Sequence, residues 1–188
     1  GYDAEGPELA RNVVINEFLA HTDLPQEDYV ELYNHGNAAV DLSGFWLSDS
    51  LTTNKFRIPD GTTLAARGFA VWNQTQLGFS LSSGGERIVL VNSNQNRVID
   101  AVAFAGQENG VSMGRTPDGS TAFRRQAALT PGASNSPALN SPVVINEIMF
   151  NPITGNSDDE FVELYNRSGS PVDLGRWRFN AGIDYTFP

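Results

Sequence analysis

The sequence contains no cysteine, and lysine is almost absent, since Lys55 is its single example. Without cysteine, the chain has no disulfide framework, no thiolate zinc site and no cysteine nucleophile. The 12 basic residues, nearly all of them arginine, are outnumbered by 22 acidic residues, which gives a formal net charge of -10. A field of that sign repels phosphate backbones, so no nucleic-acid partner is expected.

Long apolar runs are missing as well. A transmembrane helix needs roughly 18 or more consecutive apolar residues, and no stretch of this sequence reaches that length. We therefore expect no membrane span. The first residues, GYDAEGPELARN, also lack the basic and then apolar layout of a signal peptide.

Short β-branched runs separated by Gly, Pro, Asn and Ser are what the sequence does contain. Examples are VVINEFLA at 13–20, YVELYN at 29–34 and the hairpin pattern ERIVLVNSNQNRVIDAVAF at 86–104. None of these runs has a helical period, and their turn-bounded spacing is typical of antiparallel strands. Roughly eight or nine such strands predict an all-β sandwich.

An internal repeat divides the chain. VVINEF at 13–18 returns as VVINEI at 143–148, and DYVELYN at 28–34 returns as EFVELYN at 160–166. Length changes confined to the loops are typical of a true structural repeat. The predicted organisation is an N-terminal extension at 1–11, a complete domain at 12–134, a Pro- and Ser-rich linker at 135–142 and a truncated second repeat at 143–188.

Several motifs in fixed order resemble one family. They are Ile15-Asn16-Glu17, Val30-Glu31-Leu32-Tyr33-Asn34, Val40-Asp41-Leu42, Trp46-Leu47-Ser48-Asp49 and Ile58-Pro59-Asp60-Gly61-Thr62. Together they resemble the lamin tail domain, which implies an immunoglobulin-like antiparallel β-sandwich with a partial second copy. The second copy departs from the pattern at Arg178-Phe179-Asn180. The resemblance also implies a secreted or cell-surface bacterial protein, because such domains occur there as accessory modules that are not enzymes.

The functional hypothesis is a non-catalytic interaction or assembly module in a tandem-repeat surface protein. Four strands of a second copy would leave an apolar face and strand edges open, which soluble proteins avoid. We therefore predict protein partners, either copies of the chain or neighbouring repeats. The alternative is an accessory domain that directs a larger secreted nuclease, phosphatase or kinase-like enzyme to polysaccharide or calcium. The predicted interface residues are Val143, Ile145, Phe161, Val162 and Leu164.

Two acidic loops are the candidate metal ligands. Calcium prefers six to eight oxygen ligands, which clustered carboxylates and loop carbonyls supply. Neither loop has EF-hand spacing, so solvated acidic loops are the competing interpretation, and no other cofactor is required. The candidate calcium ligands are Asp23, Glu27 and Asp28 in the first copy and Asp158, Asp159 and Glu160 in the second.

Other polar and aromatic residues give no catalytic assignment. His21 and His35 lack a zinc or nucleophile motif. Glu17 and Glu31 recur as Glu147 and Glu163, and they predict either a paired-carboxylate site or hydrogen bonds to backbone N–H groups. The tryptophans fit carbohydrate stacking or a sandwich core, and the core is favoured. The one basic cluster, Arg115, Arg124 and Arg125, is interpreted as solvated strand-end arginines.

Overall fold

The computed structural model describes residues 9–179 and 182–188. The chain forms two compact units, unit 1 (Gly1–Leu139) and unit 2 (Asn140–Pro188). Apart from one helical turn, α2 (Gln74–Leu77), and the 3-10 turns η1 (Ala10–Asn12) and η2 (Ser157–Asp159), the described regular structure consists of antiparallel strands. The predicted all-β antiparallel fold is confirmed.

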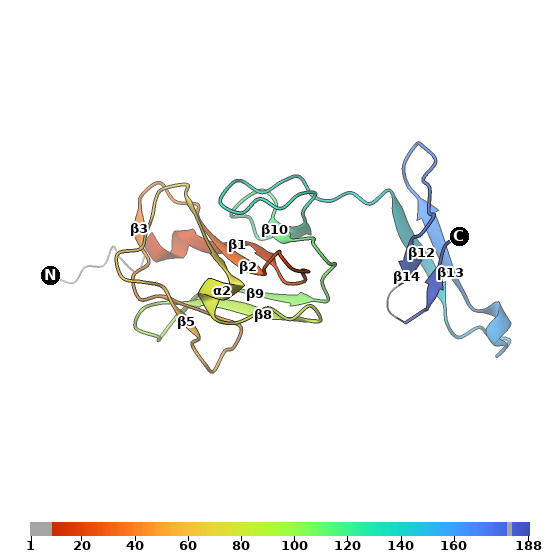
Figure 1. Cartoon of the computed structure of the whole chain (residues 1–188), viewed down its shortest axis with the longest axis horizontal. Helices are drawn as coiled ribbons and strands as arrows, with labels where there is room; N and C mark the ends of the chain where they lie inside the picture. Colours follow the sequence, from red (N-terminus) through yellow and green to blue (C-terminus); the bar gives the residue numbers. More distant parts are fainter. Residues whose placement is uncertain (1–8, 180–181) are drawn as a thin grey trace. The chain divides into compact units, whose positions relative to one another are not determined.

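Unit 1 is a sandwich of two layers, which Figure 1 shows one above the other. The first sheet has the strand order β11-β10-β1-β2-β7, and the second has the order β5-β4-β8-β9. The first sheet consists of β11 (Phe123–Arg125), β10 (Met113–Arg115), β1 (Val13–Leu19), β2 (Tyr29–Asn34) and β7 (Phe69–Asn73). The second consists of β5 (Phe56–Arg57), β4 (Trp46–Ser48), β8 (Gly85–Val91) and β9 (Val98–Ala105), with a small pair β3 (Val40–Asp41) and β6 (Thr63–Leu64) beside them.

The core lies between these layers. Ile15 and Phe18 from β1 and Leu32 from β2 are fully buried, as is Leu90 from β8. The ring of Phe18 packs on Phe104 of β9 with centroids 4.5 Å apart. Burial of each such side chain contributes about 1.5–3 kcal/mol, so this interlayer contact is a main source of stability.

A β-bulge at Asn16 decides which side chains of β1 face the core. The pairing of β1 with β2 shifts between Ile15 and Glu17, so that Glu17 lies opposite Glu31. An extra residue in one strand reverses the alternation of side chains after it. Ile15 and Phe18 therefore both face the core, while the Glu17 and Glu31 side chains lie on the outer face of the sheet.

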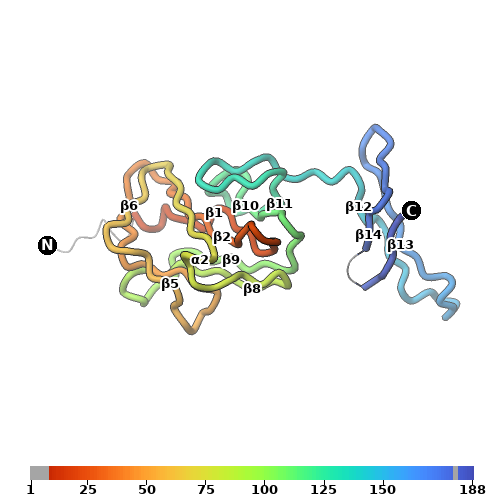
Figure 2. Tube along the Cα trace, in the orientation of Figure 1, coloured from red at the N-terminus to blue at the C-terminus, as the bar shows by residue number. Residues whose placement is uncertain are grey.

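The boundaries of unit 1 differ from those predicted at both ends. Ala10 is buried and belongs to the core, although it was assigned to an extension at 1–11, of which residues 1–8 lie outside the described residues. The predicted linker at 135–142 begins too early, because Ala138 bridges Gln126 and the Leu139 N–H donates to the Arg125 carbonyl at 2.6 Å. Figure 2 shows the segment after β11 folding back beside β10.

Unit 2 repeats part of this architecture with the same register. It contains β12 (Val143–Met149), β13 (Phe161–Asn166), β14 (Arg178–Phe179) and β15 (Tyr185–Thr186). Glu147 lies opposite Glu163, with a register shift between Ile145 and Glu147, as in β1 and β2. The β14–β15 pairing likewise repeats that of β4 and β5. At the predicted departure, Arg178 and Phe179 form β14, and Asn180 lies outside the described residues.

Helices contribute little to this fold. None of them, over the residues described, is long and apolar enough to cross a membrane.

Candidate functional site

A buried polar cluster holds a remote segment against the outer face of β1 and β2. The segment is Thr130-Pro131-Gly132-Ala133-Ser134-Asn135, hereafter the TPGASN segment. Glu17 accepts hydrogen bonds from the Thr130 N–H at 3.2 Å and the Thr130 hydroxyl at 2.9 Å. The same carboxylate accepts from the Tyr29 hydroxyl at 2.7 Å and from the Ser112 hydroxyl. Glu17 therefore fastens the start of the segment to the sheet.

Glu31 holds the middle of the segment. Its Oε2 accepts from the Gly132 N–H at 2.7 Å, and its Oε1 accepts from Asn16 Nδ2 at 3.1 Å. Asn16 also donates to Asp118 Oδ1 at 3.0 Å, and the Asn135 N–H reaches that same oxygen at 3.0 Å. The Glu31 and Asp118 carboxylates are thus joined through Asn16.

Asn135 completes the far end of the segment. Its Nδ2 donates to the Asn16 carbonyl at 3.2 Å and to the Arg115 carbonyl at 2.8 Å. The two acceptors lie 119 and 20 residues from Asn135 in sequence. The TPGASN segment is therefore held by hydrogen-bond acceptors on strands that are distant from it in sequence.

Burial controls the protonation of this cluster. Burial raises the pKa of Glu31 to about 7, with the neighbouring Glu17 and Asp118 charges adding to the rise, whereas the hydrogen bonds from Asn16 and Gly132 oppose it. Burial and the Glu17 carboxylate also raise the pKa of Tyr29 far above its usual value. The Tyr29 hydroxyl therefore stays protonated and available as a donor.

The hydrogen bonds decide between the two interpretations of the repeated carboxylates. Both Glu17 and Glu31 are fully buried beneath the TPGASN segment. A paired-carboxylate glycosidase site needs an open cleft between the two groups, which is not found here. Hydrogen bonding to backbone N–H groups is the arrangement that the structure shows for unit 1.

The same positions are open in unit 2. Asn146 still donates to Glu163, as Asn16 does to Glu31. Glu147 and Glu163 are both exposed, however, and no counterpart of the TPGASN segment lies against them within 140–179 and 182–188. The outer face of this hairpin, hereafter the carboxylate face, carries Glu147, Phe161, Glu163 and Tyr165.

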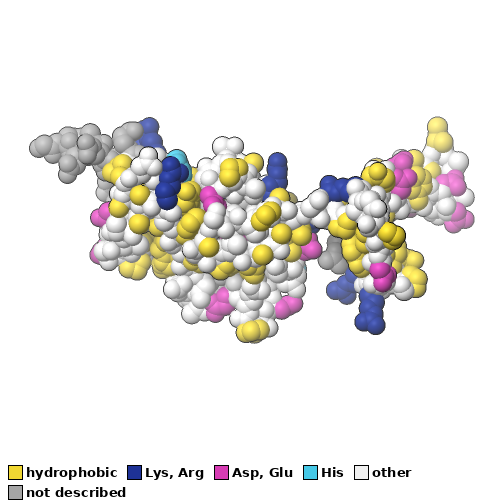
Figure 3. Space-filling model, turned by 90° about the horizontal axis from the view of Figure 1, so that it is seen from above, with side chains coloured by type: hydrophobic (Ala, Val, Ile, Leu, Met, Phe, Trp, Pro, Cys, Tyr) yellow, Lys and Arg dark blue, Asp and Glu magenta, His cyan; other side chains and the backbone are white. Residues whose placement is uncertain are grey.

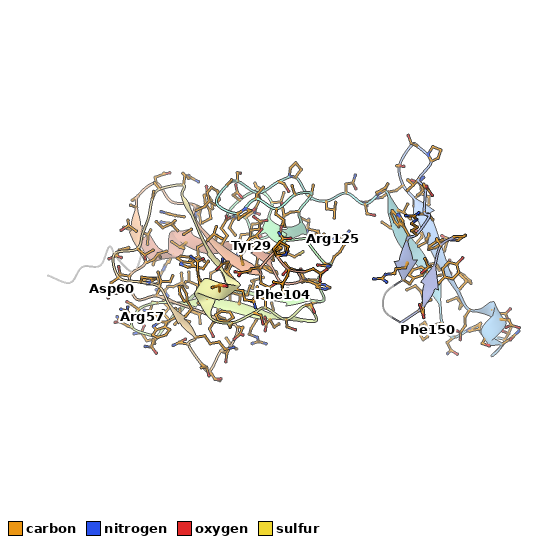
Figure 4. All side chains as sticks on the ribbon, in the orientation of Figure 1. Tyr29, Arg57, Asp60, Phe104, Arg125 and Phe150 are labelled. Carbon is orange, nitrogen blue, oxygen red and sulfur yellow. The ribbon has the colours of Figure 1, made fainter. Side chains whose placement is uncertain are left out.

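The opposite face of the hairpin is apolar and incompletely covered. Ile145 and Ile148 are 52% and 57% exposed, whereas their counterparts Ile15 and Phe18 are fully buried. Figure 3 shows hydrophobic side chains on the surface of unit 2. Phe150, labelled in Figure 4, follows β12 and is also exposed. The apolar face comprises Val143, Ile145, Ile148, Val162 and Leu164.

The predicted interface residues fall on both faces. Val143, Ile145, Val162 and Leu164 belong to the apolar face, and Phe161 belongs to the carboxylate face. Val143 is buried, and Val162 and Leu164 are half-buried. The side chains available to a partner from this predicted set are therefore chiefly Ile145 and Phe161.

The structure gives the acidic residues of the first loop protein partners. Asp28 is buried and accepts from the Leu81 N–H at 2.9 Å, and Glu27 accepts from the Thr75 hydroxyl at 2.6 Å. Asp23 accepts from Asn109 at 2.6 Å. Over the described ranges, no three acidic or histidine side chains form a metal-binding group.

In the second acidic loop the carboxylates remain on the surface. Asp158, Asp159 and Glu160 are exposed, and Asp159 accepts from the Thr154 hydroxyl. Calcium binding at the two loops stays a prediction. Its ligands would have to come together by loop rearrangement, because the carboxylates of the first loop point to different partners.

The remaining candidates take structural positions. Trp72 is buried in the core, and Trp177 occupies the position of Phe45, since the Phe187 N–H donates to its carbonyl as the Ile58 N–H does to that of Phe45. Arg115 is buried rather than solvated, because its guanidinium pairs with Asp100 at 2.8 Å.

Two further surface features of unit 1 are polar. His21 donates from Nδ1 to the Gln107 carbonyl at 2.9 Å. A hollow between the β3–β4 connection and the β8–β9 turn is lined by Asp41, Ser43, Asn92 and Arg97, among others. None of the predicted calcium ligands or interface residues lines that hollow.

Comparison with known proteins gives one family. The model of the Lamin Tail Domain family matches residues 7–106 and 136–188, which together make up most of the chain. The two matched segments lie in unit 1 and mainly in unit 2, in agreement with the internal repeat. Comparison with curated proteins found no match.

Proposed function

The chain belongs to the lamin tail domain family, and from that membership we propose that it is a non-catalytic protein-interaction and assembly module. The observation that carries the proposal is the apolar face of β12 and β13. Unit 1 buries the equivalent face beneath its second sheet, whereas unit 2 leaves Ile145 and Ile148 more than half exposed. Exposed apolar patches on soluble proteins commonly mark contacts with other proteins.

The strand edges of unit 2 support the same role. In unit 1, β1 lies between β10 and β2, and β2 lies between β1 and β7. In the described part of unit 2, β12 and β13 pair only with each other. Unpaired strand edges accept further strands through backbone hydrogen bonds.

We take the partner at the apolar face to be a second copy of this chain. The face contains no charged side chain, so its juxtaposition with an identical face brings no like charges together. Two half-sandwiches related by a twofold axis bury the same residues reciprocally. Such a contact rebuilds between two molecules the two-layer packing that unit 1 achieves by itself.

Light scattering over a concentration series tests this assembly. We expect a mass that rises above the 20.4 kDa of one chain, and a return to the single-chain mass in Ile145→Asp and Ile148→Asp. Both side chains are exposed, so these changes leave the packing of unit 2 largely intact. Ile153→Asp is the matched control, because Ile153 is fully exposed in the loop after β12 and lies off the sheet.

A single-chain mass at all concentrations overturns the self-association. Equal masses for the wild type, Ile148→Asp and Ile153→Asp overturn the assignment to the apolar face.

We also propose that the module belongs to a secreted or surface-displayed bacterial protein built from tandem copies. The support is the internal repeat, in which unit 2 reproduces the register of β1 and β2 including the bulge. Cell fractionation with an antibody against the chain tests the location. Recovery from the envelope or the medium is expected, and recovery from the cytoplasm alone contradicts it.

A further inference from the structure

We propose that the carboxylate face of unit 2 binds a Thr-Pro-Gly-x-Ser-Asn peptide segment displayed by a partner protein. The proposal rests on the interaction role above and names the ligand class for the second face of the same hairpin. Its evidence is independent of the apolar face, because it comes from the way unit 1 uses the equivalent residues.

The two units carry the same three recognition residues at the same positions. Asn16 at the bulge and Glu17 beside it correspond to Asn146 and Glu147, which follow the same register shift. Glu31 corresponds to Glu163, and in each unit the glutamate accepts a hydrogen bond from the asparagine amide. Unit 2 therefore already orients its acceptors as unit 1 does.

Unit 1 shows what these acceptors bind. The Thr130 N–H and hydroxyl donate to Glu17, and the Gly132 N–H donates to Glu31. The Asn135 amide donates to the carbonyl of Asn16. The ligand is thus a segment that turns at Pro131 and Gly132, where the Ala133 N–H donates to the Thr130 carbonyl at 3.0 Å. It offers backbone N–H groups, a threonine hydroxyl and an asparagine amide at fixed spacing.

The acceptors of unit 2 are available to such a segment. Within the described residues Glu147 accepts no hydrogen bond, and Glu163 accepts one from Asn146. The hydroxyl that Tyr29 gives to Glu17 is missing, because Phe161 stands at the equivalent position. Within the described residues, Glu147 thus lacks the donors that Glu17 has in unit 1.

Aromatic side chains beside the acceptors suit the apolar part of the ligand. Phe161 and Tyr165 are 46% and 54% exposed on the carboxylate face. Their counterparts Tyr29 and Tyr33 are buried in unit 1. The proline and small residues of the peptide gain apolar contact at such rings.

The direct test is titration of the full chain with a labelled peptide of residues 126–138, monitored by fluorescence anisotropy. We expect saturable binding of one peptide per chain. Glu147→Gln and Glu163→Gln, which alter the counterparts of Glu17 and Glu31, each weaken it by about tenfold or more. This is the loss expected when one charge-assisted hydrogen bond of about 1.5 kcal/mol or more is removed. A control peptide with Val in place of Thr130 and Leu in place of Asn135 is expected to bind at least about tenfold more weakly.

Two variants of the full chain locate the binding site. Glu31→Gln leaves peptide binding unchanged if the peptide occupies unit 2, because Glu31 serves only unit 1. Ile148→Asp also leaves peptide binding unchanged, because Ile148 lies on the apolar face.

Three outcomes overturn the proposal. They are no saturation up to about 1 mM peptide, which corresponds to about 4 kcal/mol of binding free energy, binding that persists in Glu163→Gln, and binding that is lost in Glu31→Gln. If peptide binding fails but Ile148→Asp still abolishes self-association in light scattering, only the peptide-binding proposal is overturned. Conversely, a single-chain mass with normal peptide binding overturns only the assembly at the apolar face.

Discussion

Glu17 and Glu31 lie directly opposite each other on β1 and β2, and both are fully buried. Two carboxylates in such positions repel each other and lose hydration, so each needs donors to remain inside. The donors come chiefly from Asn16, Tyr29 and the TPGASN segment. The cluster thus ties a segment more than 100 residues away to the strands at the start of the chain.

The first prediction concerns pH and Glu31. The pKa of this group is 4.5 when unperturbed and about 7 in the folded chain. Between these two pH values, the folded state keeps a proton on Glu31 that the unfolded state has released. The free energy of unfolding therefore falls as pH rises from about 4.5 to about 7, by on the order of 3 kcal/mol. Glu31→Gln removes this fall and is more stable than the wild type at about pH 8.

Urea unfolding across this pH range measures the difference. A Trp177→Phe background confines tryptophan fluorescence to Trp46 and Trp72, which lie in unit 1. Subtracting the Glu31→Gln profile from the wild-type profile isolates the Glu31 contribution from those of other carboxylates. Parallel profiles for the two proteins contradict the raised pKa.

A second prediction concerns the Tyr29 hydroxyl. Its hydrogen bond to Glu17 is buried and charge-assisted, at 2.7 Å, and such bonds contribute about 1.5–3 kcal/mol. Tyr29→Phe is expected to lower the free energy of unfolding of unit 1 by about that amount. Tyr33→Phe is the matched control, because the Tyr33 ring stacks on Phe69 and its hydroxyl makes no hydrogen bond among the described residues. Equal losses for both variants would show that Glu17 does not need the Tyr29 donor.

The sequence predicted the strands better than the segments between them. Alternation and the repeated V-I-N-E and V-E-L-Y-N motifs were enough to place β1, β2, β12 and β13, because side-chain period follows directly from strand geometry. The TPGASN segment was partly assigned to a linker, since it has no apolar period. It is held by hydrogen bonds to carboxylates that are distant in sequence. The composition of the segment does not indicate these partners.

Neither the helical turn α2 nor the burial of Arg115 was predicted from the sequence. Asn73 caps α2 through a reciprocal capping box with Gln76, a pattern readable as N-x-x-Q but too short for a helical period. In the sequence Arg115 lies near Arg124 and Arg125, and nothing in that pattern indicates its ion pair with Asp100, which is 15 residues away. Long-range charge pairing of this kind is set by the packing of β9 against β1 and β10.

A third prediction concerns Gly114, which lies against the TPGASN segment. A Cβ at this position would lie 2.7 Å from Asn135 Nδ2 and 2.9 Å from Gln126 Nε2. Both amides are held by hydrogen bonds, so neither moves freely. Gly114→Ala is expected to lower the free energy of unfolding by about 1–3 kcal/mol, as overpacking does. Gly84→Ala, whose Cβ would meet one atom at 3.7 Å, is the control and is expected to change it by less than about 1 kcal/mol.

The last prediction concerns the ion pair that braces the bulge. Arg115 donates through Nε to the Ile15 carbonyl at 2.7 Å and through Nη2 to Asp100 at 2.8 Å, while Asp100 accepts from the Ile15 N–H at 2.8 Å. Arg115→Met leaves the largely buried Asp100 charge unpaired and is expected to cost about 3–5 kcal/mol.

Asp100→Asn added to Arg115→Met removes that unpaired charge. Because the two side chains touch, the double variant is expected to be more stable than the sum of the single losses implies, by about 1–3 kcal/mol. Urea unfolding of the four proteins in the cycle measures this coupling. Strict additivity would mean that the contact between Arg115 and Asp100 adds nothing beyond the hydrogen bond that each side chain makes to Ile15.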